Sequence, residues 1–469
     1  MIICRFTRDL RLEDHAALAE AAEHGPVLPV LVLDEERVVS LRRSPRRAAF
    51  FVAAVAALDE ALCERGSALV VRRGEAAQAL VTLARETGAQ GVVWSARYDD
   101  AGARADAALH VALEEAGLTA RFVDDAPAVA PEAIERDADG AGYRSFRPYL
   151  DRWRASAVGS FDAPILLRFC APVVQSEALP SLAELDATAP AANATPRDAA
   201  TRLREFLQSE ARAYASARHA PADDGTSRLS EHLSFGTLSL RTAVRAMRDA
   251  LDNPFLLNEE RTSLRLFARA LALRDFFFQL SRFHPETDRV ALQERMREFP
   301  FAESHPKLDA WREGRTGFAL VDAGMRQLIA TGWMHPQVRA VAASFLCFDL
   351  GVDWQIGREA WNGLLVEDDP EIATGNWQWI AGIGADLAQH PRIYNPQRQL
   401  HQIDPDGRYV RRWVSELQHA PLEIGRERPP MLPLYDGNAY PAPVVDHARA
   451  ARSFLERYQA YTARSPMQE

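Results

Sequence analysis

The chain has 469 residues and a formal net charge of −10; 47% of its residues are hydrophobic and 26% are charged. This length predicts two or three domains of a globular protein. No uncharged apolar window reaches about 18 residues, and the first residues, MIICRFTRDLRLED, carry charges. We therefore expect no signal peptide, no membrane partner and a cytoplasmic location. The acidic balance argues against broad nucleic-acid binding, although a local basic groove can still bind phosphates.

The four cysteines are far apart and form no CxxC pair. This spacing argues against a disulfide framework, a zinc site and a cysteine-ligated iron–sulfur cluster. We expect no metal site and four buried thiols, namely Cys4, Cys63, Cys170 and Cys347.

The first 125 residues alternate short apolar runs with amphipathic segments such as 45–66. This alternation predicts parallel strands joined by helices, hence an α/β domain with a doubly wound parallel sheet. No GxGxxG follows the first strand, so the dinucleotide fingerprint is absent there. The predicted strands are IICRF (2–6), VLPVLVLD (27–34), ALVVRR (68–73), GVVWSA (91–96) and ARFVDD (120–125).

Residues 126–195 are rich in Ala, Pro and polar residues with little periodicity, which predicts a long connector along the surface. From residue 196 to 469 the apolar spacing is helical almost throughout. We predict a larger all-helical domain here, with room for an internal cavity.

The stretch GTSRLS (225–230) places three hydroxyls and Arg228 just before a helical pattern. Hydroxyls, backbone N–H groups and a helix start suit a diphosphate, but an ordinary capping turn has the same composition. Downstream, Trp354, Trp377 and Trp379 accompany several acidic residues. Taken alone, such tryptophans are typical of a core and such acids of helix caps.

Four segments together decide between these interpretations: GTSRLS, EGRTGFALVDAGMRQLIATGWMH, GNWQW and RIYNP. In this order they resemble the photolyase/cryptochrome family of flavoproteins, as do FTRDLRLEDHAAL near the start and YPAPVVDHARAA near the end. The resemblance covers essentially the whole chain. It implies an antenna-type α/β domain (1–125), the connector (126–195) and a helical domain (196–469) that holds FAD in a folded conformation.

The resemblance also implies roles for single residues. Arg339 and Glu367 match an ion pair beside the flavin ring, where a fixed cation stabilises the reduced anion. The other expected FAD contacts are Tyr214, Thr226, Ser227, Arg228, Leu229, Ser230, Arg274 and Asp369. The expected substrate contacts are Arg218, Trp379 and Arg392.

The sequence departs from the family's repair enzymes at the expected lesion pocket. GWMH is followed there by Asn-Arg but here by Pro336-Gln337, and proline offers neither a side-chain donor nor an N–H. A proline in the first turn leaves the helix itself intact. Each lost hydrogen bond or stacking contact costs about 1–3 kcal/mol. The other pocket positions that depart are Ala270, Leu273 and Ala340, and Ala373 stands where the family usually has an asparagine that faces the flavin.

The photoreduction route departs as well. Trp377 and Trp354 match the inner two members of the family's tryptophan relay, but the third position is Phe301. The outer step is therefore broken unless another aromatic residue, such as Trp361 or Tyr394, takes its place.

The sequence thus favours a blue-light-responsive, cryptochrome-like FAD protein with impaired or absent repair of cyclobutane dimers, and with an unknown signalling partner. The first alternative is an active DNA photolyase, a carbon–carbon lyase that acts on UV-damaged DNA of the deoxyribodipyrimidine or 6–4 type. His335 would then serve as an acid toward a 6–4 photoproduct. The second alternative is a light-independent flavoenzyme for a small molecule. An antenna chromophore, a folate or a deazaflavin, stays unassigned.

Overall fold

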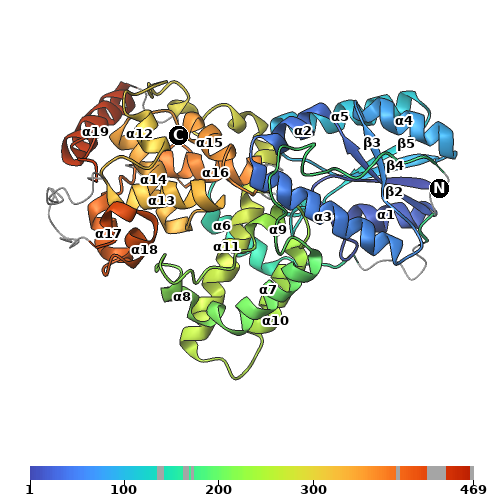
Figure 1. Ribbon diagram of the computed structural model, residues 1–469, viewed down its shortest axis with the longest axis horizontal. Helices are drawn as coiled ribbons and strands as arrows, with labels where there is room; N and C mark the ends of the chain where they lie inside the picture. Colours follow the sequence, from blue (N-terminus) through green and yellow to red (C-terminus); the bar gives the residue numbers. More distant parts are fainter. Residues whose placement is uncertain (135–141, 162–167, 171–173, 387–390, 420–439, 465–469) are drawn as a thin grey trace. The chain divides into compact units, whose positions relative to one another are not determined.

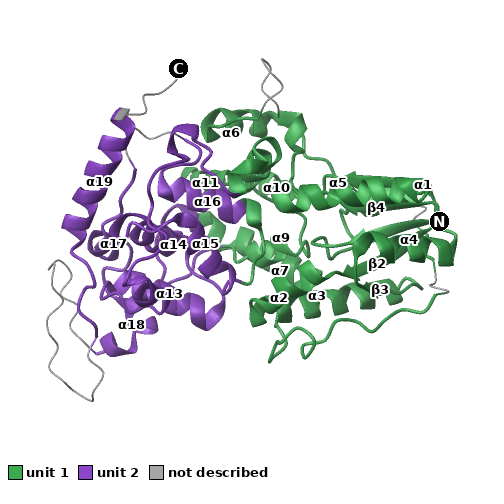
Figure 2. Cartoon of the chain, turned by 90° about the horizontal axis from the view of Figure 1, so that it is seen from above, with its two compact units in different colours: residues 1–212, 227–288, 366–371 green, residues 213–226, 289–365, 372–469 purple. Residues whose placement is uncertain are grey.

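The computed structural model describes residues 1–469 except 135–141, 162–167, 171–173, 387–390, 420–439 and 465–469 (Figure 1). The chain forms two compact units, each built from separate stretches of sequence (Figure 2). Unit 1 comprises Met1–Arg212, Ser227–Asp288 and Val366–Glu371, and unit 2 comprises Ala213–Thr226, Arg289–Leu365 and Ile372–Glu469. The sequence-based domain limits at 125 and 195 remain predictions.

Unit 1 contains a parallel five-stranded sheet in the order β3-β2-β1-β4-β5. All five predicted strands are confirmed, which confirms the doubly wound α/β class. The strands are β1 (Ile2–Phe6), β2 (Val27–Leu33), β3 (Val70–Arg73), β4 (Gly91–Ser95) and β5 (Thr119–Val123). The connecting helices are α1 (Ala16–His24), α2 (Glu35–Arg42), α3 (Pro45–Cys63), α4 (Ala76–Thr87) and α5 (Asp100–Glu115).

Helices cover both faces of this sheet (Figure 1). Along β1, Ile2, Cys4 and Phe6 pack with α1 and α3, whereas Ile3 packs with α4 and α5. This alternation follows from the two-residue period of a strand, and burial on both faces explains why the inner strand β2 is apolar throughout. The strand order reverses between β1 and β4, so their carboxyl ends form the switch point at which such sheets bind ligands.

The predicted irregular connector contains a helix, so that expectation was wrong for part of 126–195. After the short 3-10 turn η1 (Pro131–Ile134), α6 (Phe146–Ala155) buries Phe146, Tyr149 and Trp153. The Trp153 indole N–H donates to Asp275 at 2.7 Å. The apolar face of α6 is short, and the Ala- and Pro-rich sequence on both sides of it made its helical spacing hard to detect.

The rest of the described chain is helical, as predicted. Its elements are α7 (Pro196–Gln208), η2 (Glu210–Ala213), α8 (Tyr214–Ala217), α9 (Ser230–Ser234), α10 (Leu240–Leu251), α11 (Asn258–Phe283), η3 (Pro285–Asp288), η4 (Glu294–Met296), α12 (Leu308–Arg312), α13 (Ala319–Thr331), α14 (Pro336–Ser344), the π-turn η5 (Phe345–Asp349), α15 (Trp354–Asn362), α16 (Pro370–Ala381), α17 (Pro396–Ile403), α18 (Arg408–Trp413), η6 (Ser415–Leu417) and α19 (His447–Arg464). Within the described ranges, none of these helices combines the length and hydropathy that a bilayer span requires.

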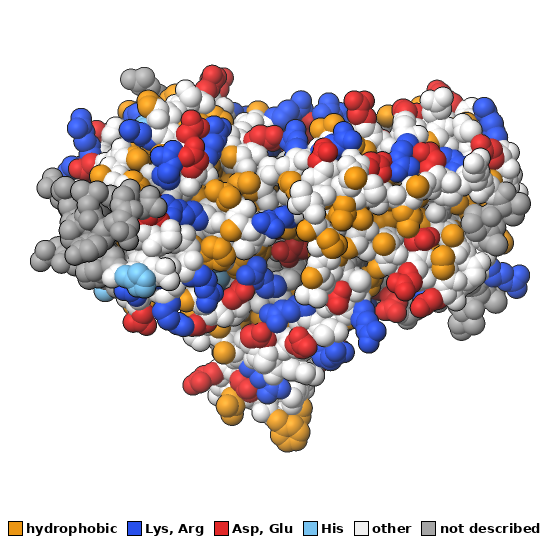
Figure 3. Space-filling view, viewed as in Figure 1, with side chains coloured by type: hydrophobic (Ala, Val, Ile, Leu, Met, Phe, Trp, Pro, Cys, Tyr) orange, Lys and Arg blue, Asp and Glu red, His pale blue; other side chains and the backbone are white. Residues whose placement is uncertain are grey.

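The charges and cysteines are distributed over the fold without forming a metal-binding set of thiols. On the face drawn in Figure 3, basic and acidic side chains are interspersed. Cys4 and Cys347 are buried as predicted, but Cys170 is half-buried and Cys63, at the end of α3, is exposed.

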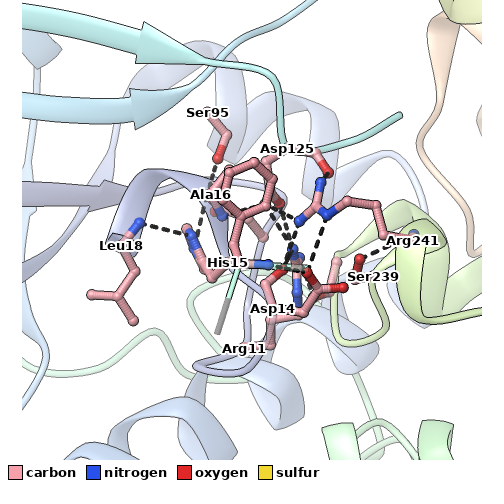
Figure 4. A network of polar contacts seen from close by, with 12 residues as sticks. Arg11, Asp14, His15, Ala16, Leu18, Ser95, Asp125, Ser239 and Arg241 are labelled. Atoms are coloured by element: carbon pink, nitrogen blue, oxygen red, sulfur yellow. Dashed lines mark hydrogen bonds and ion pairs between the residues drawn. The ribbon is translucent and has the colours of Figure 1, made fainter. Parts of the chain in front are cut away.

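A buried knot of charges joins the sheet to α10 inside unit 1 (Figure 4). Arg241 of α10 contacts Asp14 at 3.1 Å and Asp125 at 2.9 Å, and Arg11 donates both to Asp125 and to the backbone. The paired side chains are at most 6% exposed. Burial alone would raise the pKa of Asp125, but the guanidinium groups of Arg11 and Arg241 outweigh it and hold that pKa far below its usual range.

Asp9, His15 and Asp125 lie close enough together to resemble a metal site. However, His15 Nδ1 accepts a hydrogen bond from the Leu18 N–H, so Nε2 carries the proton and faces Asp9 Oδ2 at 3.2 Å. Arg11 and Arg241 already balance the charge of Asp125. We therefore interpret these three residues as part of the buried ion-pair network and not as a metal site.

Replacing Arg241 with Met is expected to lower the free energy of unfolding by about 3–5 kcal/mol, because it removes the buried cation that bridges Asp14 and Asp125. The matched control is Arg245→Met. Arg245 also contacts Asp14, at 3.1 Å, but its side chain is 31% exposed, so about 0–1 kcal/mol is expected. Chemical denaturation of both variants checks this difference, and equal losses would contradict it.

His232 is expected to make stability depend on pH. It is 5% exposed, its ring contacts Phe50, and burial lowers its pKa from 6.5 to about 4. The unfolded chain therefore binds a proton more readily. The contribution of neutral, buried His232 to the free energy of unfolding is fully present above pH 6.5 and is lost as the pH falls toward 4. Between these limits wild type should lose about 3 kcal/mol more than His232→Gln, as measured by denaturation across that pH range. Parallel curves would refute the assignment.

Candidate functional site

The stretch 225–230 forms a tight turn that leads into α9. Asp224 and Arg228 both have positive φ, 50° and 53°. A Cβ on Gly225 would lie 2.4 Å from the Cβ of Ala217, so the close approach requires glycine. The Thr226 hydroxyl donates to Asp224 at 3.1 Å. The predicted hydroxyl-rich turn therefore exists, with its backbone held in an unusual conformation.

In unit 1, Arg274 of α11 and Asp369 form a close ion pair. The guanidinium lies 2.8 Å from Asp369 Oδ2, and the two side chains are 10% and 6% exposed. The Arg274 guanidinium also lies over the Phe278 ring at 5.6 Å. The structure thus brings together two of the predicted FAD contacts, which are 95 residues apart in the sequence.

Pro336 is the first residue of α14, where its missing N–H breaks no helical hydrogen bond. His335 caps this helix, because its Nδ1 accepts from the Gln337 N–H at 3.3 Å. His335 is fully buried, and its own N–H donates to Gln327 Oε1 at 3.1 Å. The proline thus fits the fold without strain, and His335 has a structural role as a cap.

Three tryptophans of unit 2 form a ladder that the sequence indicated only in part. The ring centroids of Trp377 and Trp361 are 4.5 Å apart. Trp361 stacks on Trp311 with a centroid distance of 6.1 Å and an angle of 15° between the ring planes. All three are buried, and the Trp311 indole N–H donates to the Ala342 carbonyl at 3.0 Å. Gly357 makes room for the ladder, because a Cβ there would lie 2.2 Å from Trp377.

The relay expected from the sequence, through Trp377, Trp354 and Phe301, differs from this ladder after Trp377. The Arg358 guanidinium lies over the Trp354 ring at 5.0 Å. Phe301, at the outer position, packs on Phe299 at 4.8 Å and Phe454 at 6.1 Å. A positive charge therefore faces the second predicted relay member, and a phenylalanine cluster surrounds the third.

The remaining predicted residues are distributed between the two units. Unit 1 holds Ser227, Arg228, Leu229, Ser230, Arg274, Glu367 and Asp369, and unit 2 holds Tyr214, Arg218, Thr226, His335, Arg339, Trp354, Trp377, Trp379 and Arg392. In unit 2, burial raises the pKa of Tyr214, Arg218 contacts His219 at 3.1 Å, Trp379 is half-buried and Arg392 is exposed. Arg339 donates to the Met334 carbonyl at 2.8 Å. Its predicted pairing with Glu367 stays a prediction.

The positions that depart from the repair pattern are accessible. On α11, Ala270 is exposed and Leu273 is half-buried. In unit 2, Pro336 is exposed, while Ala340 and Ala373 are half-buried. Small or apolar side chains thus stand at partly open positions of both units.

Two features of the site were missed in the sequence. Asp368 is held by arginines of the α/β part of unit 1, more than 300 residues earlier in the chain. A small pocket also lies at the carboxyl ends of β1 and β4, lined by residues 7–9 and 95–98, among others, and by Asp369. The acidic run EDDPE (367–371) was visible, but nothing in the sequence identified its partners.

Comparison with known proteins assigns this arrangement. The model for the FAD binding domain of DNA photolyase matches residues 267–460, and the DNA photolyase model matches 2–165. Similar curated proteins include the deoxyribodipyrimidine photo-lyases of Agrobacterium fabrum, 34% identical over 98% of both chains, and of Streptomyces griseus, 36% identical over 96% and 97%.

Solved structures agree. A bacterial class III photolyase from Agrobacterium tumefaciens is 32% identical with a TM-score of 0.82, and a Synechocystis cryptochrome is 25% identical with a TM-score of 0.85. Each comparison covers 98% of both chains. The chain therefore belongs to the photolyase/cryptochrome family and contains its FAD-binding domain.

Proposed function

We propose that this protein is a DNA photolyase, which uses FAD and blue light to cleave pyrimidine photoproducts in UV-damaged DNA. The observation that carries the proposal is the full-length similarity, at 34% and 36% identity, to proteins named deoxyribodipyrimidine photo-lyase. Bound FAD supplies a light-absorbing ring that exchanges single electrons. This proposal favours the first alternative of the sequence analysis over its leading interpretation.

The chain's own residues have three tasks in this proposal. The turn at 225–230 and Arg274 hold the cofactor's charged and polar parts, and Asp369 fixes the Arg274 side chain. Tryptophans of unit 2 provide a buried path for electrons. The lesion pocket, expected around Ala270, Leu273, Pro336 and Ala340, must receive a nucleotide flipped out of the duplex. Photolyases are a known example of this step.

A cryptochrome-like protein without cyclobutane repair is the second candidate. The specific observation in its favour is the loss of polar and stacking groups at Ala270, Leu273, Pro336, Ala340 and Ala373. Under the photolyase proposal, other groups must replace them. Gln337, half-buried in the first turn of α14, offers a carboxamide one residue after the missing donor. Carboxamides pair with the donors and acceptors of base edges.

Light-driven repair distinguishes the two candidates. Photoreduced protein is mixed with oligonucleotides that carry either a thymine cyclobutane dimer or a 6–4 photoproduct, and restored thymines are scored by chromatography. The photolyase proposal expects restoration of at least one lesion and, for Gln337→Ala, a turnover reduced by about tenfold, the value of one lost polar contact. Gln402→Ala, exposed on α17, is the matched control. No restoration of either lesion by protein with reducible flavin would favour the cryptochrome-like candidate.

The ladder predicts which tryptophan supplies electrons during photoreduction. In this proposal Trp377 would be the electron donor when FAD is bound, Trp361 would resupply Trp377, and Trp311 would resupply Trp361 along the stacked rings. A unit charge at 5.0 Å, the position of Arg358 over Trp354, opposes oxidation of that ring by about 3 kcal/mol at an effective dielectric constant near 20. The nearby Asp353 offsets part of this penalty.

Trp361→Phe is therefore expected to slow flavin photoreduction, with a thiol as the external reductant, by about tenfold or more, which corresponds to about 1.4 kcal/mol in barrier. Trp354→Phe should have the smaller effect. Transient absorption of the tryptophan radical gives the measurement, and bound FAD per chain verifies that both variants stay loaded. A larger effect of Trp354→Phe would contradict the ladder route.

A further inference from the structure

The segment Val366–Glu371 belongs to unit 1, whereas the residues before and after it belong to unit 2. It contains both acidic residues that are predicted to contact FAD, Glu367 and Asp369. Between them lies Asp368, which has no part in the predicted cofactor contacts. What holds this segment in unit 1 therefore determines where the two flanking carboxylates stand.

The Asp368 carboxylate is held by side chains of α2 and α3. Arg37 Nη1 lies 2.8 Å from Oδ2, and the Ser40 hydroxyl donates to the same oxygen at 3.1 Å. Arg47 Nη1 lies 3.5 Å from Oδ1, and the Arg47 side chain is fully buried. Burial would raise the pKa of Asp368, but Arg47, Arg37 and Arg8 outweigh it and lower that pKa to about 2, so the group is ionised at neutral pH.

The backbone around Asp368 is held by the same part of the fold. Arg8, just after β1, donates to the Asp368 carbonyl at 2.7 Å. Arg47 Nη2 donates to the Glu367 carbonyl at 3.1 Å. The Asp368 N–H donates to the Ser234 hydroxyl at 2.7 Å. Side chain and main chain are thus fixed together, which leaves the segment little freedom to rotate or slide.

Successive side chains of the segment point to different partners. Asp368 meets Arg37, whereas Asp369, the next residue, meets Arg274 of α11 at 2.8 Å. A displacement of the backbone at 368 therefore moves Asp369 relative to Arg274. The contact with the sheet domain and the contact with the flavin-site arginine are mechanically linked through one peptide unit.

We propose that Asp368 is a positioning residue of the FAD site, through which Arg8, Arg37 and Arg47 of the α/β domain set the placement of Glu367 and Asp369. The inference rests on the proposed FAD chemistry of this site. It gives the α/β domain a role in cofactor binding that requires no antenna chromophore.

The test is Asp368→Asn in the full-length chain. Asparagine keeps the shape but removes the charge, so the arginines lose their counter-ion and the segment loosens. FAD affinity, measured by flavin fluorescence on titration of apoprotein, should fall about tenfold or more, the range for a lost charged hydrogen bond. Hydrogen–deuterium exchange of the 366–371 peptide should rise in the apoprotein, and the visible circular dichroism of bound flavin should change.

Glu184→Gln is the matched control, since it breaks the two-oxygen pair of Glu184 with Arg73 elsewhere in the α/β domain. It should leave affinity, exchange of 366–371 and dichroism unchanged. If Asp368→Asn does not fold, Ser234→Ala removes one milder contact, to the Asp368 N–H, and should weaken FAD binding by about threefold to tenfold.

The positioning role would be overturned if folded Asp368→Asn kept the FAD affinity and the dichroism of wild type. If that variant does not fold, the same result for Ser234→Ala would overturn it. Either result would leave the proposed function intact. Wild-type protein that takes up no FAD would overturn both.

Discussion

The buried pairing of Arg241 with Asp14 and Asp125 is the constraint on which the rest of unit 1 depends. The sheet supplies the carboxylates, from the loops after β1 and β5, and α10 supplies the cation more than 110 residues later. Neither partner is stable in that environment alone, because a lone buried charge costs several kcal/mol. The sheet and the helices α10 and α11 of the same unit are therefore held together, and α11 presents Arg274 at a fixed place in unit 1.

A second set of arginines extends the same principle to the segment that carries Asp369. Arg8, Arg37 and Arg47 hold residues 367 and 368 by the main chain as well as by the side chain. Directional hydrogen bonds to carbonyl oxygens fix orientation in a way that apolar packing does not. Asp369 can then meet Arg274 although α11 and the acidic segment are about a hundred residues apart. Arginines thus supply the cations for buried carboxylates at both places, Arg241 for Asp14 and Asp125, and Arg37 and Arg47 for Asp368.

Sequence reasoning predicted the features that depend on local pattern. Short apolar runs between helical segments predicted all five strands, and 3.6-residue spacing predicted helices such as α10 and α11. It missed α6, whose apolar face is only ten residues long, and it expected Cys63 to be buried although that residue ends an exposed helix terminus. Contacts such as Arg37–Asp368 were beyond reach, because charge alone does not identify a partner 331 residues away. Of the ladder Trp377–Trp361–Trp311, the sequence predicted Trp377 as a relay member and offered Trp361 as a substitute, but it did not indicate Trp311, since ring stacking depends on how α12, α15 and α16 pack.

Pro336 shows why the fold and the lesion pocket can diverge separately. At the first position of α14 the missing N–H has no intrahelical partner to lose, and His335 supplies the cap from the residue before. The same holds for Ala270, which is exposed, and for Leu273, Ala340 and Ala373, which are half-buried. Substitutions at such positions cost little folding free energy, whereas Arg274, Asp369 and the buried tryptophans are tied to partners on several elements. Selection can therefore alter what the pocket receives while the cofactor site stays fixed. The accessible positions can therefore change without loss of the fold, whereas the buried and paired ones cannot.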